Sequence, residues 1–140
     1  MGLAQRIDEA LHRTFGLAYL CVARERSIHE RCDYARAAFA ALGLDRPRVL
    51  DVGCGGGILL RHLARAPIAA ASYTGLDWRA TRLDSRYRDV RLPHRFLDID
   101  LDSDWQVEGD DAAWCSEVLE HLIDDAGVLR KIARSVVPGA

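Results

Sequence analysis

Hydrophobic and polar residues follow two different patterns along the chain. In residues 1–46 the apolar positions recur at steps of three and four, which is typical of amphipathic helices. One stripe comprises Ile7, Leu11, Phe15, Ala18 and Val22, and a second comprises Cys32, Ala35, Phe39 and Leu42. Gly43 is a natural end for the second helix. The pattern predicts an N-terminal helical cap over residues 1–46, with a polar connection over residues 24–31.

From residue 47 onward, short apolar runs alternate with stretches of helical spacing. We expect strands at 48–52, 72–76, 95–99 and 112–116, and helices at 57–66, 80–87 and 125–137. Strands that alternate with helices indicate a parallel sheet, because right-handed crossovers place the helices on its faces. The sequence therefore predicts an α/β core over residues 47–140, with about four strands and helices on both faces. At this length, cap and core are expected to form one structural domain.

The end of the chain carries a turn signal. The last predicted helix leads into Pro138, Gly139 and Ala140, a combination that is typical of turns. The fourth strand would then lie at an edge of the sheet, and bare edge strands invite pairing. We therefore expect either a core that is incomplete at its C-terminus, or a second copy of the chain or another partner that covers this edge.

Composition narrows the class of protein. The 19 basic and 21 acidic residues give a formal net charge of −2, so no general electrostatic field attracts nucleic acid. The cysteines form no CxxC pair and no zinc spacing, and free thiols fit a reducing cytoplasm. No apolar run approaches the ~20 residues of a membrane span. We expect a cytoplasmic protein without a membrane span.

A glycine-rich turn joins the first strand of the core to its first helix. Gly53, Gly55 and Gly57 stand at alternate positions just after Asp51. Glycine allows positive φ and close approach of a ligand to the main chain, and a strand, glycine turn and helix together bind nucleotide cofactors. A dinucleotide fingerprint needs glycine at position 58, where Ile58 stands. The Asp51 carboxylate also suits a cationic amine better than a pyrophosphate, which favours S-adenosylmethionine over NAD.

Residues 49–57 resemble motif I of the class I S-adenosylmethionine-dependent methyltransferases, and later signals follow in the order of that family over roughly residues 30–140. The resemblance implies a Rossmann-like fold whose cofactor lies against Asp51, Gly53, Cys54, Gly55 and Gly57. Residues 73–77 are similar to the family's second strand, whose terminal acid, Asp77 here, holds the ribose hydroxyls. Charge-assisted hydrogen bonds make a carboxylate suitable for that role. Trp78, next along the chain, can pack on the adenine.

The third strand resembles its counterpart in the family, where an acid contacts the adenine amino group and an apolar neighbour contacts the ring. Two pairs fit this pattern, Asp98 with Ile99 and Asp100 with Leu101, and spacing does not choose between them. The resemblance also implies that the N-terminal cap covers the cofactor. Arg31 and Tyr34 would then reach the cofactor carboxylate, although both also fit ordinary exposed or half-buried helix positions.

Residues 112–122 resemble the segment after the fourth strand in the ubiquinone-biosynthesis O-methyltransferase-like group, and we place Cys115 beside the cofactor. If the segment is helical, Glu117, Glu120 and His121 project from adjacent turns. Three roles are open for them. His121 with Glu117 can act as a general base, the three side chains can bind a divalent metal, as the resemblance implies for some relatives, or they can shape the acceptor pocket.

The favoured function is methyl transfer from S-adenosylmethionine to an oxygen or nitrogen of a small-molecule acceptor, with S-adenosylhomocysteine as product. One alternative is an RNA 3′-terminal 2′-O-methyltransferase with a divalent metal. An arginine cluster would supply its basic groove, formed by Arg79, Arg82, Arg86, Arg88, Arg91 and Arg95. Another alternative is a truncated module that binds the cofactor without catalysis. An NAD oxidoreductase is disfavoured by Ile58. The acceptor, the dependence on metal and the oligomeric state stay open.

Overall fold

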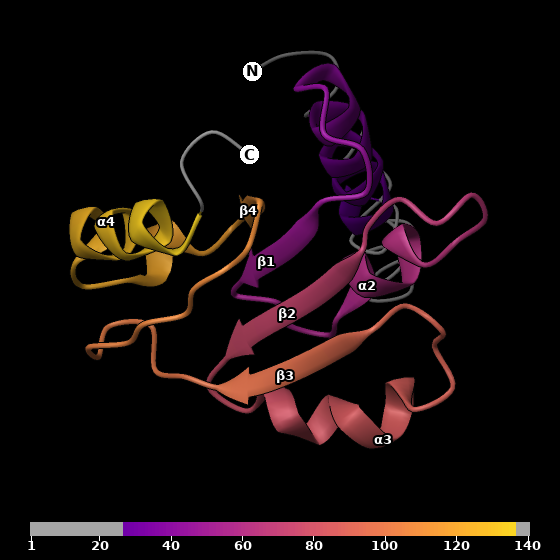
Figure 1. Ribbon diagram of the computed structural model, residues 1–140. Helices are drawn as coiled ribbons and strands as arrows, with labels where there is room; N and C mark the ends of the chain where they lie inside the picture. Colours follow the sequence, from indigo (N-terminus) through magenta and orange to yellow (C-terminus); the bar gives the residue numbers. More distant parts are fainter. Residues whose placement is uncertain (1–26, 137–140) are drawn as a thin grey trace, which may run out of the picture.

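The computed structural model describes residues 27–136, which form a four-stranded parallel sheet in the order β3-β2-β1-β4 (Figure 1). The strands are β1 (Arg48–Val52), β2 (Ser72–Asp77), β3 (His94–Asp98) and β4 (Ala112–Cys115). The predicted bounds of β1 are confirmed, and each end of the other three strands lies within one residue of its predicted place. The predicted parallel α/β architecture is therefore confirmed.

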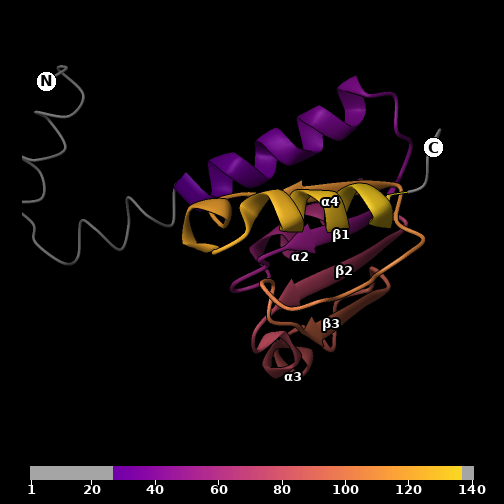
Figure 2. The ribbon, with the colours of Figure 1, turned by 90° about the vertical axis from the view of Figure 1, so that its left-hand side faces the viewer.

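Helices cover both faces of the sheet, as predicted. The helix over residues 27–41 and α2 (Ile58–Leu63) lie on one face, and α4 (Asp125–Ser135) lies on the other (Figures 1 and 2). Successive strand residues point to opposite faces, so Val49 packs into the first core cluster while Leu50 and Val52 pack into the second. The sheet thus separates two apolar layers.

The N-terminal helix packs on the sheet through the predicted second stripe. Cys32, Ala35 and Phe39 are buried. The expectation for Leu42 is wrong: its side chain is 72% exposed, because the helix ends at residue 41 and Leu42 lies in the turn that Gly43 completes with a φ of 71°. Residues 27–31 are helical rather than a polar connection. The first stripe, from Ile7 to Val22, lies outside the described residues.

The core helices are shorter than their apolar patterns predict. Helix α2 ends at Leu63 instead of residue 66, and the Arg36 guanidinium binds the His62 carbonyl that would otherwise accept from residue 66. The predicted helix over 80–87 begins as a 3₁₀ turn, η1 (Ala80–Leu83), before α3 (Asp84–Tyr87). Helix α4 ends at Ser135, where the chain returns to the sheet.

Strand β4 is the outer strand, as predicted. Beyond its pairing with β1, the described residues provide only an isolated parallel bridge between Asp110 and Val136 beside it. Coverage of this edge by a second copy or another partner stays a prediction. Within residues 27–136, no helix is long and apolar enough to cross a membrane.

Candidate cofactor site

The glycine turn between β1 and α2 is fastened to the carboxyl end of the neighbouring strand β2. The backbone N–H groups of Gly53 and Cys54 both donate to the Leu76 carbonyl, at 2.9 Å each. The turn is possible because Gly53, Gly55 and Gly57 take φ values of 76°, 53° and 69°, which L side chains rarely adopt. The local sequence therefore fixes the backbone at the edge where the strands end.

The three glycines differ in what a side chain at each position would meet. A Cβ on Gly53 would lie 2.2 Å from Val118 Cγ2, and one on Gly57 would lie 2.8 Å from the Tyr87 ring. Close packing explains both positions, and the Tyr87 hydroxyl adds a 2.6 Å hydrogen bond to the Gly56 carbonyl. A Cβ on Gly55 would meet no atom within 4 Å. Gly55 is thus the glycine that leaves the backbone open to a ligand.

A cavity of about 450 Å³, which we call the carboxyl-end cavity, lies in front of this turn. Its volume falls in the range of small-molecule sites, about 300–1,000 Å³. Three segments that are distant in sequence supply its walls: the glycine turn, the ends of β2 and β3, and the segment after β4. Its lining consists of Gly53, Gly55, Asp77, Trp78, Ile99, Asp100, Leu101, Glu117, Val118, His121 and Leu122. Most residues predicted from the family motifs therefore converge on one cavity.

Asp77 connects the glycine turn to the cavity. Its Oδ2 accepts a 2.9 Å hydrogen bond from the Gly55 N–H, and its Oδ1 accepts one of 2.8 Å from the Trp78 N–H. Each carboxylate oxygen has a further lone pair, so Asp77 can still accept from two hydroxyl groups. The Trp78 side chain is 63% exposed, and the Arg79 guanidinium stacks 4.3 Å from its ring centre. Trp78 therefore belongs to the rim of the cavity rather than to the core.

The structure distinguishes the two acids after β3. Asp98 lies outside the lining of the carboxyl-end cavity, so its expected role at the cofactor gains no support from this cavity and stays a prediction. Its carboxylate accepts from the N–H and the hydroxyl of Thr81, at 2.8 and 2.7 Å, and these bonds lower its pKa. It therefore fixes the start of η1. Asp100 lines the cavity between Ile99 and Leu101, which favours the second of the two predicted pairs.

The segment after β4 does not have the predicted helical arrangement. Its 3₁₀ turn, η2 (Leu119–His121), begins after Glu117, which has a left-handed φ of 58°. Glu117 and His121 both line the cavity, whereas Glu120 approaches His121 only at 3.9 Å. Among the described residues, no three His, Cys, Asp or Glu side chains are grouped to hold a metal. The described geometry therefore does not support the three-ligand set of Glu117, Glu120 and His121, and a metal at this site stays a prediction.

A second, smaller cavity of about 80 Å³ adjoins the first at Gly53, which lines both. It lies beneath the N-terminal helix, and Arg31 and Asp51 are among its polar wall residues. Asp51 is buried and accepts a 2.6 Å hydrogen bond from the Tyr73 hydroxyl. Burial raises the pKa of Asp51 to about 7, and the nearby Asp77 carboxylate adds to the shift. The small cavity thus holds an acid that titrates near neutrality.

An ion pair spans the boundary between the two cavities. Arg31 of the N-terminal helix approaches Glu117 at 3.0 Å, and it also donates to the Ser27 hydroxyl at 3.2 Å. The sequence motifs did not predict this pair, because its partners are 86 positions apart in the numbering. The predicted neighbour Tyr34 lines neither cavity, and its side chain is 70% exposed. Arg31, but not Tyr34, therefore lies at a cavity wall.

The cysteines have an apolar role in this region. Cys54 is buried beneath the glycine turn and lines the small cavity, whereas Cys115 packs against the second core cluster outside both cavity walls. Burial raises the pKa of both thiols, that of Cys115 to about 11. A thiol that stays protonated is a poor nucleophile. Cys54 is therefore a wall residue of the small cavity, whereas the expected contact of Cys115 with the cofactor stays a prediction without support from either cavity.

Two apolar residues of the cavity were missed by the motif analysis. Val118 and Leu122 line the cavity and also pack against the second core cluster. Their sequence signal is ordinary apolar spacing, which does not distinguish a ligand wall from a core position. Two members of the predicted arginine cluster lie apart. Arg79 stacks on Trp78 of the carboxyl-end cavity, whereas Arg95 lines a cavity formed by the amino ends of the strands.

Comparisons with known proteins identify the family of the chain. A family model described as a methyltransferase domain matches residues 50–140. The chain belongs to this methyltransferase family. A ubiquinone biosynthesis O-methyltransferase of Alkalilimnicola ehrlichii is 35% identical over 114 residues, which cover 78% of this chain and 44% of the relative. A ubiquinone biosynthesis O-methyltransferase of Aeromonas salmonicida is 37% identical over 102 residues, which cover 69% of this chain and 42% of that relative. The chain thus spans less than half the length of these relatives.

Solved structures show the same fold. An S-adenosylmethionine-dependent methyltransferase from Mesorhizobium loti is 26% identical, with a TM-score of 0.57 over 68% of this chain and 44% of that chain. The SAM-bound amino pentose methyltransferase CalS10 from Micromonospora echinaspora has a TM-score of 0.66 over 89% of this chain and 54% of that chain. At 22% identity, the second likeness concerns the fold alone. Together they confirm the class I Rossmann-like architecture.

Proposed function

We propose that this methyltransferase-family chain binds S-adenosylmethionine and transfers its methyl group to an oxygen or nitrogen of a small-molecule acceptor. The observation that carries the proposal is the convergence of Gly55, Asp77 and Asp100 on one cavity of about 450 Å³. The curated relatives, which are ubiquinone biosynthesis O-methyltransferases, favour oxygen as the acceptor atom. Because the chain covers less than half of those relatives, the acceptor itself is left open.

The residues present fit an adenosyl cofactor. The open face of Gly55 lets a ligand lie against the main chain, and Asp77 has acceptor capacity left for ribose hydroxyls. Asp100 would accept from the adenine amino group, with Ile99 and Leu101 against the ring. Arg31 and Asp51, in the small cavity beyond Gly53, would hold the carboxylate and the ammonium of the amino-acid end. The two cavities therefore match the two ends of the cofactor.

The bound cofactor supplies a methyl group already activated on a sulfonium, so the protein has little covalent chemistry to perform. The chain's own residues have to orient the acceptor in line with that methyl group and exclude water. Glu117 and His121 face the carboxyl-end cavity and are the side chains that can accept a proton from an acceptor hydroxyl. Val118 and Leu122 give the same wall an apolar surface.

The ion pair between Arg31 and Glu117 couples these two tasks. A cofactor carboxylate at Arg31 would compete with Glu117 for the same guanidinium, which binds carboxylates strongly. If Arg31 bound the cofactor carboxylate instead, the Glu117 carboxylate would be free to accept from an acceptor hydroxyl. The left-handed backbone at Glu117 supports this role, since strained residues cluster at functional sites. Cofactor binding would thus prepare the acceptor side of the cavity.

Calorimetric titration of the chain with S-adenosylhomocysteine tests the proposal. We expect micromolar binding, about −8 kcal/mol, and a Kd at least tenfold higher for Asp77→Asn. Asp89→Asn is the matched control, because Asp89 is an exposed acid after α3 and lines neither cavity. A folded chain that does not bind S-adenosylhomocysteine would contradict the assignment. Location of the protein in the cytoplasm stays a prediction.

A further inference from the structure

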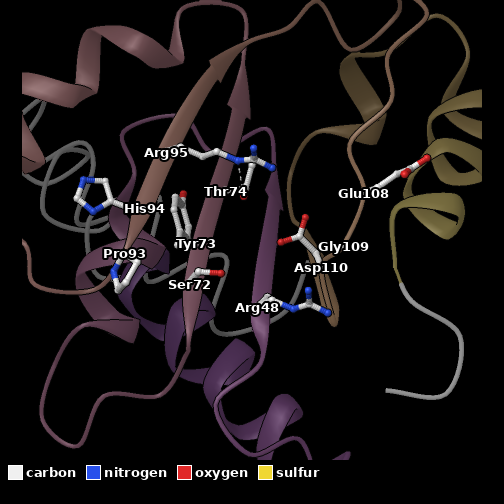
Figure 3. A pocket seen from close by; sticks show the side chains of 10 residues that line it. All are labelled: Arg48, Ser72, Tyr73, Thr74, Pro93, His94, Arg95, Glu108, Gly109 and Asp110. Atoms are coloured by element: carbon white, nitrogen blue, oxygen red, sulfur yellow. Dashed lines mark hydrogen bonds between the residues drawn. The ribbon is translucent and has the colours of Figure 1, made fainter.

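A separate cavity of about 320 Å³, which we call the amino-end cavity, lies at the opposite end of the sheet (Figure 3). Arg48, Ser72 and Arg95, at or near the amino ends of β1, β2 and β3, contribute to its wall. The segment before β4 closes it with Gly109 and Asp110. No residue lines both this cavity and the carboxyl-end cavity. The methyl-transfer proposal therefore makes no use of it.

Asp110 is the unusual member of this wall. Its side chain is only 4% exposed, and its Oδ2 has no hydrogen-bond partner in the described part of the chain. A buried acceptor without a partner destabilises a fold by about 1–3 kcal/mol. Burial also raises the pKa of this carboxyl. An unpartnered buried oxygen at a cavity wall indicates that a donor from outside the described residues belongs there.

Arg95 faces Asp110 across the cavity, and in Figure 3 their polar ends point toward one another. Arg95 donates from Nε to Thr74 Oγ1 at 3.2 Å, and the described residues give its terminal nitrogens no acceptor. The other guanidinium of the wall is engaged, because Arg48 binds Asp111 at 2.6 and 3.0 Å. No ion pair joins Arg95 to Asp110 in residues 27–136. The positive charge of Arg95 opposes the effect of burial on the pKa of Asp110. No hydrogen bond joins the two groups within residues 27–136, so both keep hydrogen-bonding capacity for a ligand.

We propose that the amino-end cavity binds a small zwitterion of the amino-acid class, whose ammonium group donates to Asp110 and whose carboxylate accepts from Arg95. A ligand with only a negative charge would leave the buried Asp110 oxygen without a donor. A ligand with only a positive charge would lie against the Arg95 guanidinium. The zwitterion satisfies both groups, and the hydroxyl of Ser72 on the same wall offers a further hydrogen bond. This proposal does not depend on the methyltransferase activity.

The experiment is an NMR titration of the isotope-labelled chain with glycine, β-alanine and 4-aminobutyrate, which separate the two charges by increasing lengths. Butyrate and n-butylammonium are the singly charged controls. We expect saturable shifts of the Ser72, Arg95 and Gly109 amides with at least one zwitterion. Binding should be at least tenfold weaker in Asp110→Asn and in Arg95→Gln, and unchanged in Asp89→Asn.

Each other outcome overturns the proposal. If no zwitterion gives saturable shifts, the cavity holds water only. If butyrate or n-butylammonium binds as tightly as the zwitterion, the paired recognition by Arg95 and Asp110 is wrong. If Asp110→Asn fails to fold, Arg95→Gln supplies the same test, because this side chain is exposed and outside both core clusters. Unchanged binding in that variant would also overturn the assignment.

Discussion

The carboxyl-end and amino-end cavities lie at opposite ends of the same strands, and they are built in different ways. The carboxyl-end cavity depends on backbone geometry, with a turn of three left-handed glycines held to the Leu76 carbonyl. The amino-end cavity depends on side chains, with Asp110 and Arg95 facing each other and no hydrogen bond between them in the described residues. The glycine turn of the first is a short contiguous motif, even though distant segments complete its walls. The second arises only when segments far apart in the sequence meet, so a motif analysis does not detect it.

The glycine turn offers the sharpest test of the backbone-built site. In Gly53→Ala the new Cβ would meet Val118 at 2.2 Å on a left-handed backbone. We expect the free energy of unfolding to fall by about 3 kcal/mol, combining conformational strain with overpacking. Gly55→Ala shares the left-handed backbone but meets no atom, so about 1 kcal/mol is expected. Urea denaturation measures both, and equal losses would contradict the division of roles between the two glycines.

Asp51 tests whether the small cavity holds a carboxyl that is protonated below neutrality. Its pKa is raised to about 7 by burial, whereas an unfolded aspartate titrates near 3.9. The folded state therefore binds the extra proton between these values, and the resulting stability is lost as the pH rises through 7. We expect the free energy of unfolding to fall by about 3 kcal/mol from pH 5 to pH 8, relative to Asp51→Asn. Equal free energies of unfolding at pH 5 and pH 8 would contradict this prediction and would show that Asp51 behaves as an ordinary carboxylate.

The sequence predicted the regular parts of the fold well and the irregular parts poorly, for physical reasons. Strand β1 and the stripe of Cys32, Ala35 and Phe39 follow from local periodicity, which short-range sterics and burial enforce. Helix α2 ends earlier than predicted, and at this end the Arg36 guanidinium, 26 positions before His62, binds the His62 carbonyl. Local spacing contains no information about that contact.

At the site too, local patterns predicted some residues, whereas contacts between distant segments determined others. Asp77 is placed by the strand end that precedes it, and its position at the cavity could be predicted from the motif. Asp98 and Asp100 have equal local signals, and only the hydrogen bonds from Thr81 assign Asp98 to the fold. The arrangement of Glu117 and His121 was missed because a left-handed residue interrupts the expected helix. Tertiary contacts thus decide what the motif leaves open.

Replacing Glu117 and replacing Arg31 should change the affinity for S-adenosylhomocysteine in opposite directions. Glu117→Gln removes the competitor for Arg31, so we expect S-adenosylhomocysteine to bind about five times more tightly, close to 1 kcal/mol. Arg31→Met should weaken binding by a similar factor. The binding of 5′-methylthioadenosine, which lacks the amino-acid end, should change in neither variant. Calorimetry with both ligands measures this, and weaker binding to Glu117→Gln would exclude the exchange of partners.

The smallest predicted effect concerns Trp78. Its replacement tests whether this side chain serves ligand binding or the packing of the core. Its ring is 63% exposed and lines the carboxyl-end cavity, while its stacking partner Arg79 is also exposed. Replacing it in Trp78→Ala should change the free energy of unfolding by no more than about 0.5 kcal/mol, as for surface substitutions. The Kd for S-adenosylhomocysteine should nevertheless rise about threefold, because an aromatic wall of the adenine side is lost. A large loss of stability with unchanged binding would place Trp78 in the packing of the fold, and the carboxyl-end cavity would then be bounded on that side by Asp77 and Asp100 alone.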